Sequence, residues 1–233
     1  MAKSLPLVLI PGLLCTEELW RHQIENLSDI SDIWVPDTTR RHTIAETAED
    51  ILAAAPTEFA LAGLSMGGYI SFEIVRREPK RVAKLALLDT NARADLPEQA
   101  ANRRIAMNQV EQGEFRGVTD TLIPSLIHPG RLGDKELVDT VKAMARDVGK
   151  DAYIRQQTAI IGRTDNRPLL PTITCPTMVV VGREDALTPP KVAQEIVDGI
   201  PNAELVIIEE CGHLSTIEKP EEVTSHMRRW LTA

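Results

Sequence analysis

The sequence predicts an α/β fold with a mostly parallel sheet, helices on both of its faces and an inserted helical lid. Along residues 1–92, short apolar runs alternate with segments of helical periodicity, and the alternation returns over residues 170–233. Strand followed by helix, repeated, is typical of βαβ units. Between them, residues 93–169 contain helical patterns and no convincing strand. We therefore expect a core built from 1–92 and 170–233, interrupted by a helical lid at 93–169.

Six apolar runs predict the strands. Leu5–Ile10 is stopped by Pro11 and Gly12, and Ile33–Val35 ends before Pro36. A short apolar run with such a stop is typical of a buried strand. The remaining runs are Phe59–Leu64, Val82–Leu88, Met178–Val181 and Ala203–Ile208.

Helical patterns lie between and after these runs. Thr43 followed by Glu46 matches a capping box, in which the threonine hydroxyl accepts from a backbone amide of the first helical turn. The expected core helices are Glu17–Leu27, Thr43–Ala55, Gly67–Arg77, Pro190–Val197 and Glu221–Leu231. Four more are expected in the insertion, at Arg103–Val110, Phe115–Ile127, Lys135–Val148 and Ala152–Ile161.

Length and charge narrow the class of protein. A chain of 233 residues fits one α/β domain with an insertion, and 43% apolar with 26% charged residues is ordinary for a globular protein. The net charge of −8, without basic runs, argues against nucleic acid and anionic membranes as partners. A small-molecule substrate is the expected partner, and the oligomeric state is left open.

The cysteines and the N-terminus bear on the compartment. Cys15, Cys175 and Cys211 are far apart, with no metal-ligand spacing and no even disulfide set, which favours a reducing compartment. The apolar run near the N-terminus is too short for a signal peptide or a membrane span. We expect a cytoplasmic protein, with Cys15 as a small buried side chain rather than a nucleophile.

Ser65 is the candidate nucleophile. It is the centre of Gly63-Leu64-Ser65-Met66-Gly67, a G-x-S-x-G pentapeptide that follows a predicted strand and opens a predicted helix. The chain must turn sharply there, so side chains at positions 63 and 67 would collide with the turn. Such a pentapeptide can also arise by chance in a glycine-containing turn, and the strand–turn–helix context favours the functional interpretation.

A serine hydroxyl needs a base within hydrogen-bond reach before it can attack. The five histidines are His22, His42, His128, His213 and His226. Only His213 follows a predicted core strand, in the loop Glu209–His213 at the carboxyl edge of the sheet, where sites of parallel sheets lie. We therefore predict His213 as the general base.

Asp185 is the candidate acid that orients the base. It comes just after the run Met178–Val181, and the chain order Ser, Asp, His is the order of a nucleophile-elbow enzyme. Glu184 is adjacent, and Asp89 also ends a strand, so both are alternatives. Asp185 is preferred over Asp89 because only Asp185 follows that order.

The oxyanion of an acyl-transfer intermediate needs two backbone N–H donors. One should be Met66, the residue after the nucleophile, and the other should come from the loop after the first strand, where we choose Leu13. The alternative interpretation of Pro11-Gly12 is an ordinary turn.

Four segments carry a resemblance to a known family. LVLIPGLLC, LAGLSMGGYIS, VVVGREDALTPP and IEECGHLSTIEKPEEV together resemble the α/β-hydrolase superfamily, in its branch of small single-domain serine esterases, over nearly the whole chain. The resemblance implies about six strands here, since the chain starts at the third strand of the full eight-stranded form. Many members have His-Gly where this chain has Pro11-Gly12, but the donor there is a backbone amide.

The resemblance implies a serine hydrolase that cleaves a carboxylic ester of a small or medium substrate, with no metal and no organic cofactor. C–C bond hydrolysis, perhydrolysis or a lyase step on the same triad are alternatives, as are a non-catalytic ligand-binding receptor and a structural module. The segment Asn91–Thr172 carries 12 basic and 11 acidic residues and is less acidic than the rest, which is compatible with a carboxylate-bearing substrate.

Overall fold

The computed structural model describes residues 5–113 and 115–233, and its centre is one parallel sheet in the order β2-β1-β3-β4-β5-β6. The strands are β1 (Leu7–Ile10), β2 (Ile33–Trp34), β3 (Phe59–Leu64), β4 (Val82–Leu88), β5 (Thr177–Gly182) and β6 (Ala203–Ile208). The strand order reverses at β1, because β2 pairs with one of its edges and β3 with the other. Open α/β sheets bind ligands at such a reversal, outside the carboxyl ends of the strands.

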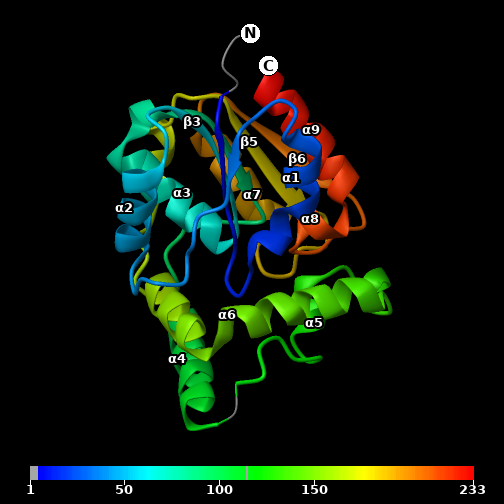
Figure 1. Ribbon diagram of the computed structural model, residues 1–233. Coiled ribbons are helices and arrows are strands. Elements are labelled where there is room, and N and C mark those ends of the chain that lie inside the picture. Colours follow the sequence, from blue (N-terminus) through cyan, green and yellow to red (C-terminus); the bar gives the residue numbers. More distant parts are fainter. Residues whose placement is uncertain (1–4, 114) are drawn as a thin grey trace.

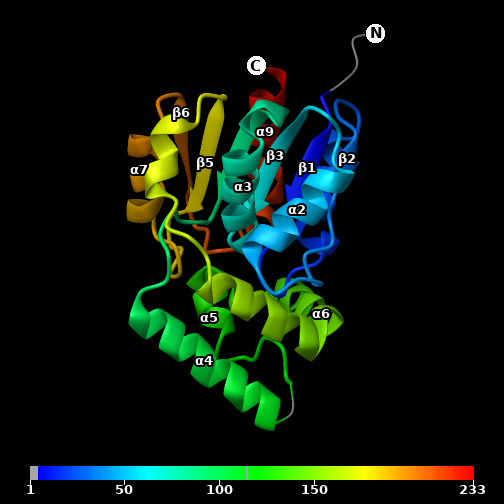
Figure 2. The ribbon, with the colours of Figure 1, turned by 90° about the vertical axis from the view of Figure 1, so that its left-hand side faces the viewer.

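Helices cover both faces of the sheet (Figures 1 and 2). One face carries α2 (Ile44–Ala54), α3 (Met66–Arg77) and α7 (Pro190–Gly199), and the other carries α1 (Arg21–Leu27) and α9 (Pro220–Thr232). Alternate residues of one strand therefore enter different cores: Val8 belongs to the cluster that contains Phe72 of α3, whereas Leu9 belongs to the cluster that contains Met227 of α9. Burial on both faces explains why the strands are apolar at nearly every position.

The elements predicted for the core are confirmed to within a few residues at their ends. Thr43 caps α2 by accepting from the amide of Glu46 at 3.1 Å. The expected helix Glu17–Leu27 is split into a 3₁₀ turn, Glu17–Trp20, and α1. Other short helical segments are α8 (Ser215–Glu218) and the 3₁₀ turns Pro79–Arg81, Pro129–Arg131 and Arg167–Thr172.

Between β4 and β5 the chain forms helices that lie across one end of the sheet, below the strands in Figure 1. They are α4 (Pro97–Gln112), α5 (Ile123–Leu126) and α6 (Lys135–Ile161), and the described part of this segment contains no strand. Gly149, with φ +77°, interrupts α6, so the two helices predicted there meet at a kink.

The prediction of a helix at Phe115–Ile127 is wrong. Only Ile123–Leu126 is helical, and the residues before it form turns and irregular chain. Gly117 takes φ +62°, a left-handed conformation that ends helical geometry, and Pro124 has no N–H and fits only the first turn of a helix. No helix in the described residues is long and apolar enough to cross a membrane.

Candidate active site

Ser65 lies in a strained turn between β3 and α3, with φ +54° and ψ −113°. Its amide donates to the carbonyl of Leu88 at 2.9 Å, which ties the turn to β4. A Cβ on Gly63 would lie 2.3 Å from the carbonyl oxygen of Gly67, and one on Gly67 would lie 2.1 Å from that of Ile10. Both glycines are therefore required by close backbone approach, as the pentapeptide predicts.

The three residues predicted as a triad lie together at the carboxyl ends of the strands. Nε2 of His213 is 2.9 Å from Oγ of Ser65, and Nδ1 of His213 is 2.8 Å from Oδ2 of Asp185. The amides of Leu187 and Thr188 donate to the other oxygen, Oδ1 of Asp185, at 2.8 and 2.9 Å. Because Asp185 accepts at Nδ1, the imidazole can hold its proton there and present Nε2 to Ser65 as an acceptor.

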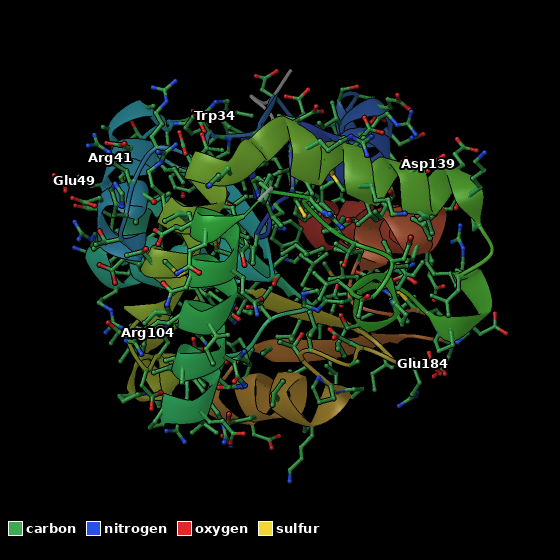
Figure 3. All side chains as sticks on the ribbon, turned by 90° about the horizontal axis from the view of Figure 1, so that it is seen from below. Trp34, Arg41, Glu49, Arg104, Asp139 and Glu184 are labelled. Atoms are coloured by element: carbon green, nitrogen blue, oxygen red, sulfur yellow. The ribbon has the colours of Figure 1, made fainter. Side chains whose placement is uncertain are left out.

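The two rival acids lie elsewhere. Glu184 is 37% exposed in its side chain, appears at the edge of the molecule in Figure 3, and accepts from the amide of Cys211 at 3.1 Å. Asp89 is buried and accepts from the amide of Gly182 at 3.0 Å, and from the amide and hydroxyl of Ser215 at 3.1 and 2.5 Å. Asp185 alone of the three is hydrogen-bonded to His213.

Burial and charge shift the proton affinities of these groups in opposite directions. Burial lowers the pKa of His213, but Asp185 together with the more distant carboxyl groups of Asp89 and Glu218 outweighs burial, so the pKa is raised above its ordinary value. Burial raises the pKa of Asp185, but the charge of His213 and its hydrogen bond hold the pKa below its usual range. Burial and the neighbouring charge of Asp185 raise the pKa of Asp89 to about 8.

The loop after β1 approaches Ser65 closely. A Cβ on Gly12 would lie 3.4 Å from Cβ of Ser65. In this loop the amide of Leu14 donates to Oε1 of Gln156 at 3.1 Å and is therefore occupied. The amide of Leu13 has no hydrogen-bond acceptor among the described residues. Met66 begins α3, where the first N–H groups lack intrahelical partners. The amides of the two predicted oxyanion donors are therefore not used by other hydrogen bonds among the described residues.

A cavity of about 520 Å³ opens above Ser65 and His213. One wall comes from the core and includes Leu13, Tyr69 and Thr188. The opposite wall comes from the insertion and includes Val118, Leu126, Val141, Met144 and Tyr153. The insertion therefore shapes the space that a substrate would fill.

Glu218 joins the histidine loop to the insertion. Its Oε1 accepts from the amides of Gly212 and Leu214, at 3.0 and 3.1 Å, and its Oε2 accepts from the amide of His128 at 2.6 Å. The amide of His213 itself donates to the carbonyl of Leu126 at 3.0 Å. The sequence motif contained Glu218, but no local pattern indicated that its carboxylate binds the backbone on both sides of His213.

No cluster of histidine, cysteine and carboxylate side chains in the described residues could hold a metal ion. The three cysteines form no disulfide, and burial raises the pKa of the Cys15 thiol to about 12. Its thiol is therefore protonated at neutral pH, and it packs in the core beside the loop as predicted.

The sequence profile described as the alpha/beta hydrolase fold matches residues 40–220. This chain belongs to the α/β hydrolase family. The hydrolase is 31% identical to a thermophilic esterase from Thermogutta terrifontis, solved with malate bound, with a TM-score of 0.92 over 99% of this chain and 90% of that one. It is 27% identical to the pimeloyl-[acyl-carrier protein] methyl ester esterase of Hamiltonella defensa, over 94% of this chain and 90% of that protein.

An enol-lactonase from Burkholderia xenovorans LB400 has the same fold, with a TM-score of 0.85 at 24% identity over 99% of this chain and 92% of that one. These alignments extend over the core and the insertion alike. The predicted family and the predicted six-stranded parallel sheet are therefore both confirmed.

Proposed function

We propose that this α/β hydrolase cleaves carboxylic esters of small or medium size through an acyl-enzyme formed on Ser65. The observation that carries the proposal is a pair of hydrogen bonds through the imidazole of His213. Nε2 lies 2.9 Å from Oγ of Ser65, and Nδ1 lies 2.8 Å from Oδ2 of Asp185. Nucleophile, base and orienting acid at these distances form the constellation that activates a serine.

In the first half-reaction, His213 takes the proton of Ser65 as Oγ attacks the ester carbonyl carbon. The amides of Leu13 and Met66 stabilise the oxyanion of the tetrahedral intermediate. The C–O bond to the alcohol then breaks, and His213 returns the proton to the leaving alkoxide. In the second half-reaction, water attacks the acyl-enzyme with His213 again as the base, releasing the acid and restoring Ser65. Asp185 stabilises the imidazolium in both steps.

The relatives support an ester as the bond that is cleaved. The thermophilic esterase and the methyl ester esterase both carry an ester-cleaving activity in their names, and both match this chain over nearly its whole length. The cavity of about 520 Å³ has the size of a small-molecule site, which favours a compact substrate.

Hydrolysis of p-nitrophenyl esters from acetate to decanoate tests the proposal. We expect turnover of the short and medium esters, and a loss of about 10⁵- to 10⁶-fold in kcat for Ser65→Ala and for His213→Ala, because the triad acts as a unit. Labelling of Ser65 by a fluorophosphonate provides a readout of the nucleophile that does not depend on substrate choice. Turnover that persists in Ser65→Ala would contradict the mechanism.

Labelling without turnover would instead favour different chemistry on the same triad, such as C–C hydrolysis, perhydrolysis or a lyase step, and product analysis separates these. Absence of both would favour a ligand-binding relative without catalysis.

A further inference from the structure

A buried charged cluster lies in the wall of the same cavity, away from the triad. Asp95 is shared by two arginines: its Oδ1 accepts from Nη1 of Arg163 at 2.7 Å, and its Oδ2 accepts from Nε of Arg103 at 2.8 Å. The side chains of Asp95 and Arg163 are only 2% and 3% exposed, and that of Arg103 is 27% exposed. All three line the cavity that contains Ser65 and His213.

The charges in this cluster do not balance. Two guanidinium groups face one carboxylate, and Asp95 is the only acidic residue among the described residues that line the cavity. In the part of the chain that the structure describes, Nη2 of each arginine has no hydrogen-bond acceptor. Neither Nη2 is a fully buried atom, so the unused donors of both arginines stay open to an anion that enters the cavity.

Both guanidinium groups are held in place by neutral neighbours. Arg163 stacks over the ring of Tyr69, 4.3 Å from its centroid, and donates from Nε to the carbonyl of Arg93 at 2.9 Å. Arg103 donates from Nη1 to Oε1 of Gln157 at 2.9 Å. Tyr69 lies on α3, one helical turn after Ser65, so the cationic group is fixed to the element that carries the nucleophile. Side chains fixed in this way need little further ordering when a ligand binds.

We propose that Arg103 and Arg163 form an anion subsite, and that the substrate is an ester carrying a free carboxylate on the acyl part. The inference rests on the proposed function, which puts the scissile ester at Ser65. Guanidinium groups match the planar geometry of a carboxylate and bind it through paired N–H donors. Apolar side chains such as Leu126, Val141 and Met144 also line the cavity and suit the methylene chain between the two ends.

Monomethyl esters of unbranched dicarboxylic acids, from succinate to suberate, probe the subsite. Each is compared with a neutral methyl ester in which an isopropyl group replaces the carboxylate, and hydrolysis is followed by acid release at constant pH. We expect the wild-type kcat/KM to favour the charged ester at one chain length by at least about tenfold, since a hydrogen-bonded charge contributes that much. The preferred length reports the spacing between Ser65 and the arginines.

The decisive variant is Arg103→Gln, with Arg104→Gln as its matched control. Arg104 is the next residue on α4, is exposed, lies at the outer edge of the molecule in Figure 3 and does not line the cavity. Arg103→Gln should lower kcat/KM for the charged ester about ten- to hundredfold, mainly through KM, and change that for the neutral ester less than about twofold. Arg104→Gln should leave both unchanged.

Equal loss on charged and neutral esters would assign Arg103 a purely structural role and overturn the subsite. Neutral esters hydrolysed as fast as charged ones by the wild type would also overturn it, while leaving the serine esterase mechanism intact.

Calorimetric binding of the same esters to Ser65→Ala gives a result even if no ester is turned over. Preferential binding of the charged ester, lost in Ser65→Ala/Arg103→Gln, supports the subsite regardless of the chemistry. Absence of any preference for the charged ester at every chain length overturns it.

Discussion

Two neighbouring strands of this hydrolase are each followed by a buried aspartate, and the two aspartates have different partners. Asp89 follows β4 and Asp185 follows β5, and both are nearly inaccessible to solvent. Asp185 accepts a hydrogen bond from the ring of His213, whereas Asp89 accepts from the backbone of Gly182 and from Ser215. The carboxylate of Asp185 binds the general base. The carboxyl group of Asp89 instead joins Gly182, at the end of β5, to Ser215, two residues after His213.

The opposite pKa shifts follow from these partners. The cation that can form on His213 favours an ionised Asp185 and holds its pKa low. Asp89 accepts hydrogen bonds from uncharged amide and hydroxyl groups. Burial together with the nearby charge of Asp185 raises the pKa of Asp89 to about 8. An apolar strand followed by aspartate is therefore not enough to identify the acid of a catalytic triad, because the role of the aspartate depends on which residues it contacts in the fold.

Activity should separate the two aspartates most strongly. Asp185→Asn should lower kcat on p-nitrophenyl acetate by about 10⁴-fold, because the amide favours the wrong tautomer of His213. Asp89→Asn should lower kcat less than about tenfold, because Asp89 makes no hydrogen bond to His213 or to the hydroxyl of Ser65 and the substitution keeps the shape of the side chain. A nearly active Asp185→Asn enzyme beside an inactive Asp89→Asn enzyme would reverse the assignment.

Stability should separate them in the other direction. Asp89→Ala leaves the amide of Gly182 and both donors of Ser215 without their acceptor, so we expect the free energy of unfolding to fall by about 2–4 kcal/mol. Asp185→Asn keeps the oxygen that accepts from Leu187 and Thr188, and should lose less. Urea denaturation of the two variants measures the difference, and equal losses would remove the structural distinction between the sites.

The pH profile gives the smallest effect. His213 must be neutral to accept the serine proton, so activity falls as pH drops through its pKa, and because that pKa is raised, the acid limb of kcat/KM should have a midpoint above about 6.5. Asp185→Asn removes the charge that raises this pKa, so its residual activity should persist to lower pH. A wild-type midpoint below the ordinary imidazole value would contradict the electrostatic coupling.

Much of the core and of the triad could be predicted because the signals are local. The turn at Ser65 needs glycine on both sides, and Asp185 and His213 each lie in the loop that follows an apolar strand, so topology brings them to one edge of the sheet. Chain order alone favoured Asp185 over Asp89, which stayed an alternative until the structure showed the bond from Asp185 to His213.

The insertion was less predictable, because its structure depends on distant partners. The region Phe115–Ile127 has apolar residues that suit a helix, but Gly117 and Pro124 confine the helix to a single turn. The pairing of Asp95 with Arg163 joins residues 68 apart in the chain, and no spacing rule connects them. Glu218 likewise contacts His128 across 90 residues. The Asp95–Arg163 pair forms only when the insertion folds on itself, and the Glu218–His128 bond forms only when the insertion folds onto the core.

The bonds from Glu218 and from Leu126 to the histidine loop have a consequence for how this enzyme could diversify. The segment that shapes the substrate cavity also supplies the acceptor for the amide of His213, and Glu218 binds the backbone of both. Exchanging residues 93–169 for those of a homologue would therefore keep the base in place only if the new segment brought a backbone carbonyl and a backbone amide to the positions of Leu126 and His128. We therefore expect point changes within the insertion to alter specificity with less disturbance of His213 than exchange of the whole segment.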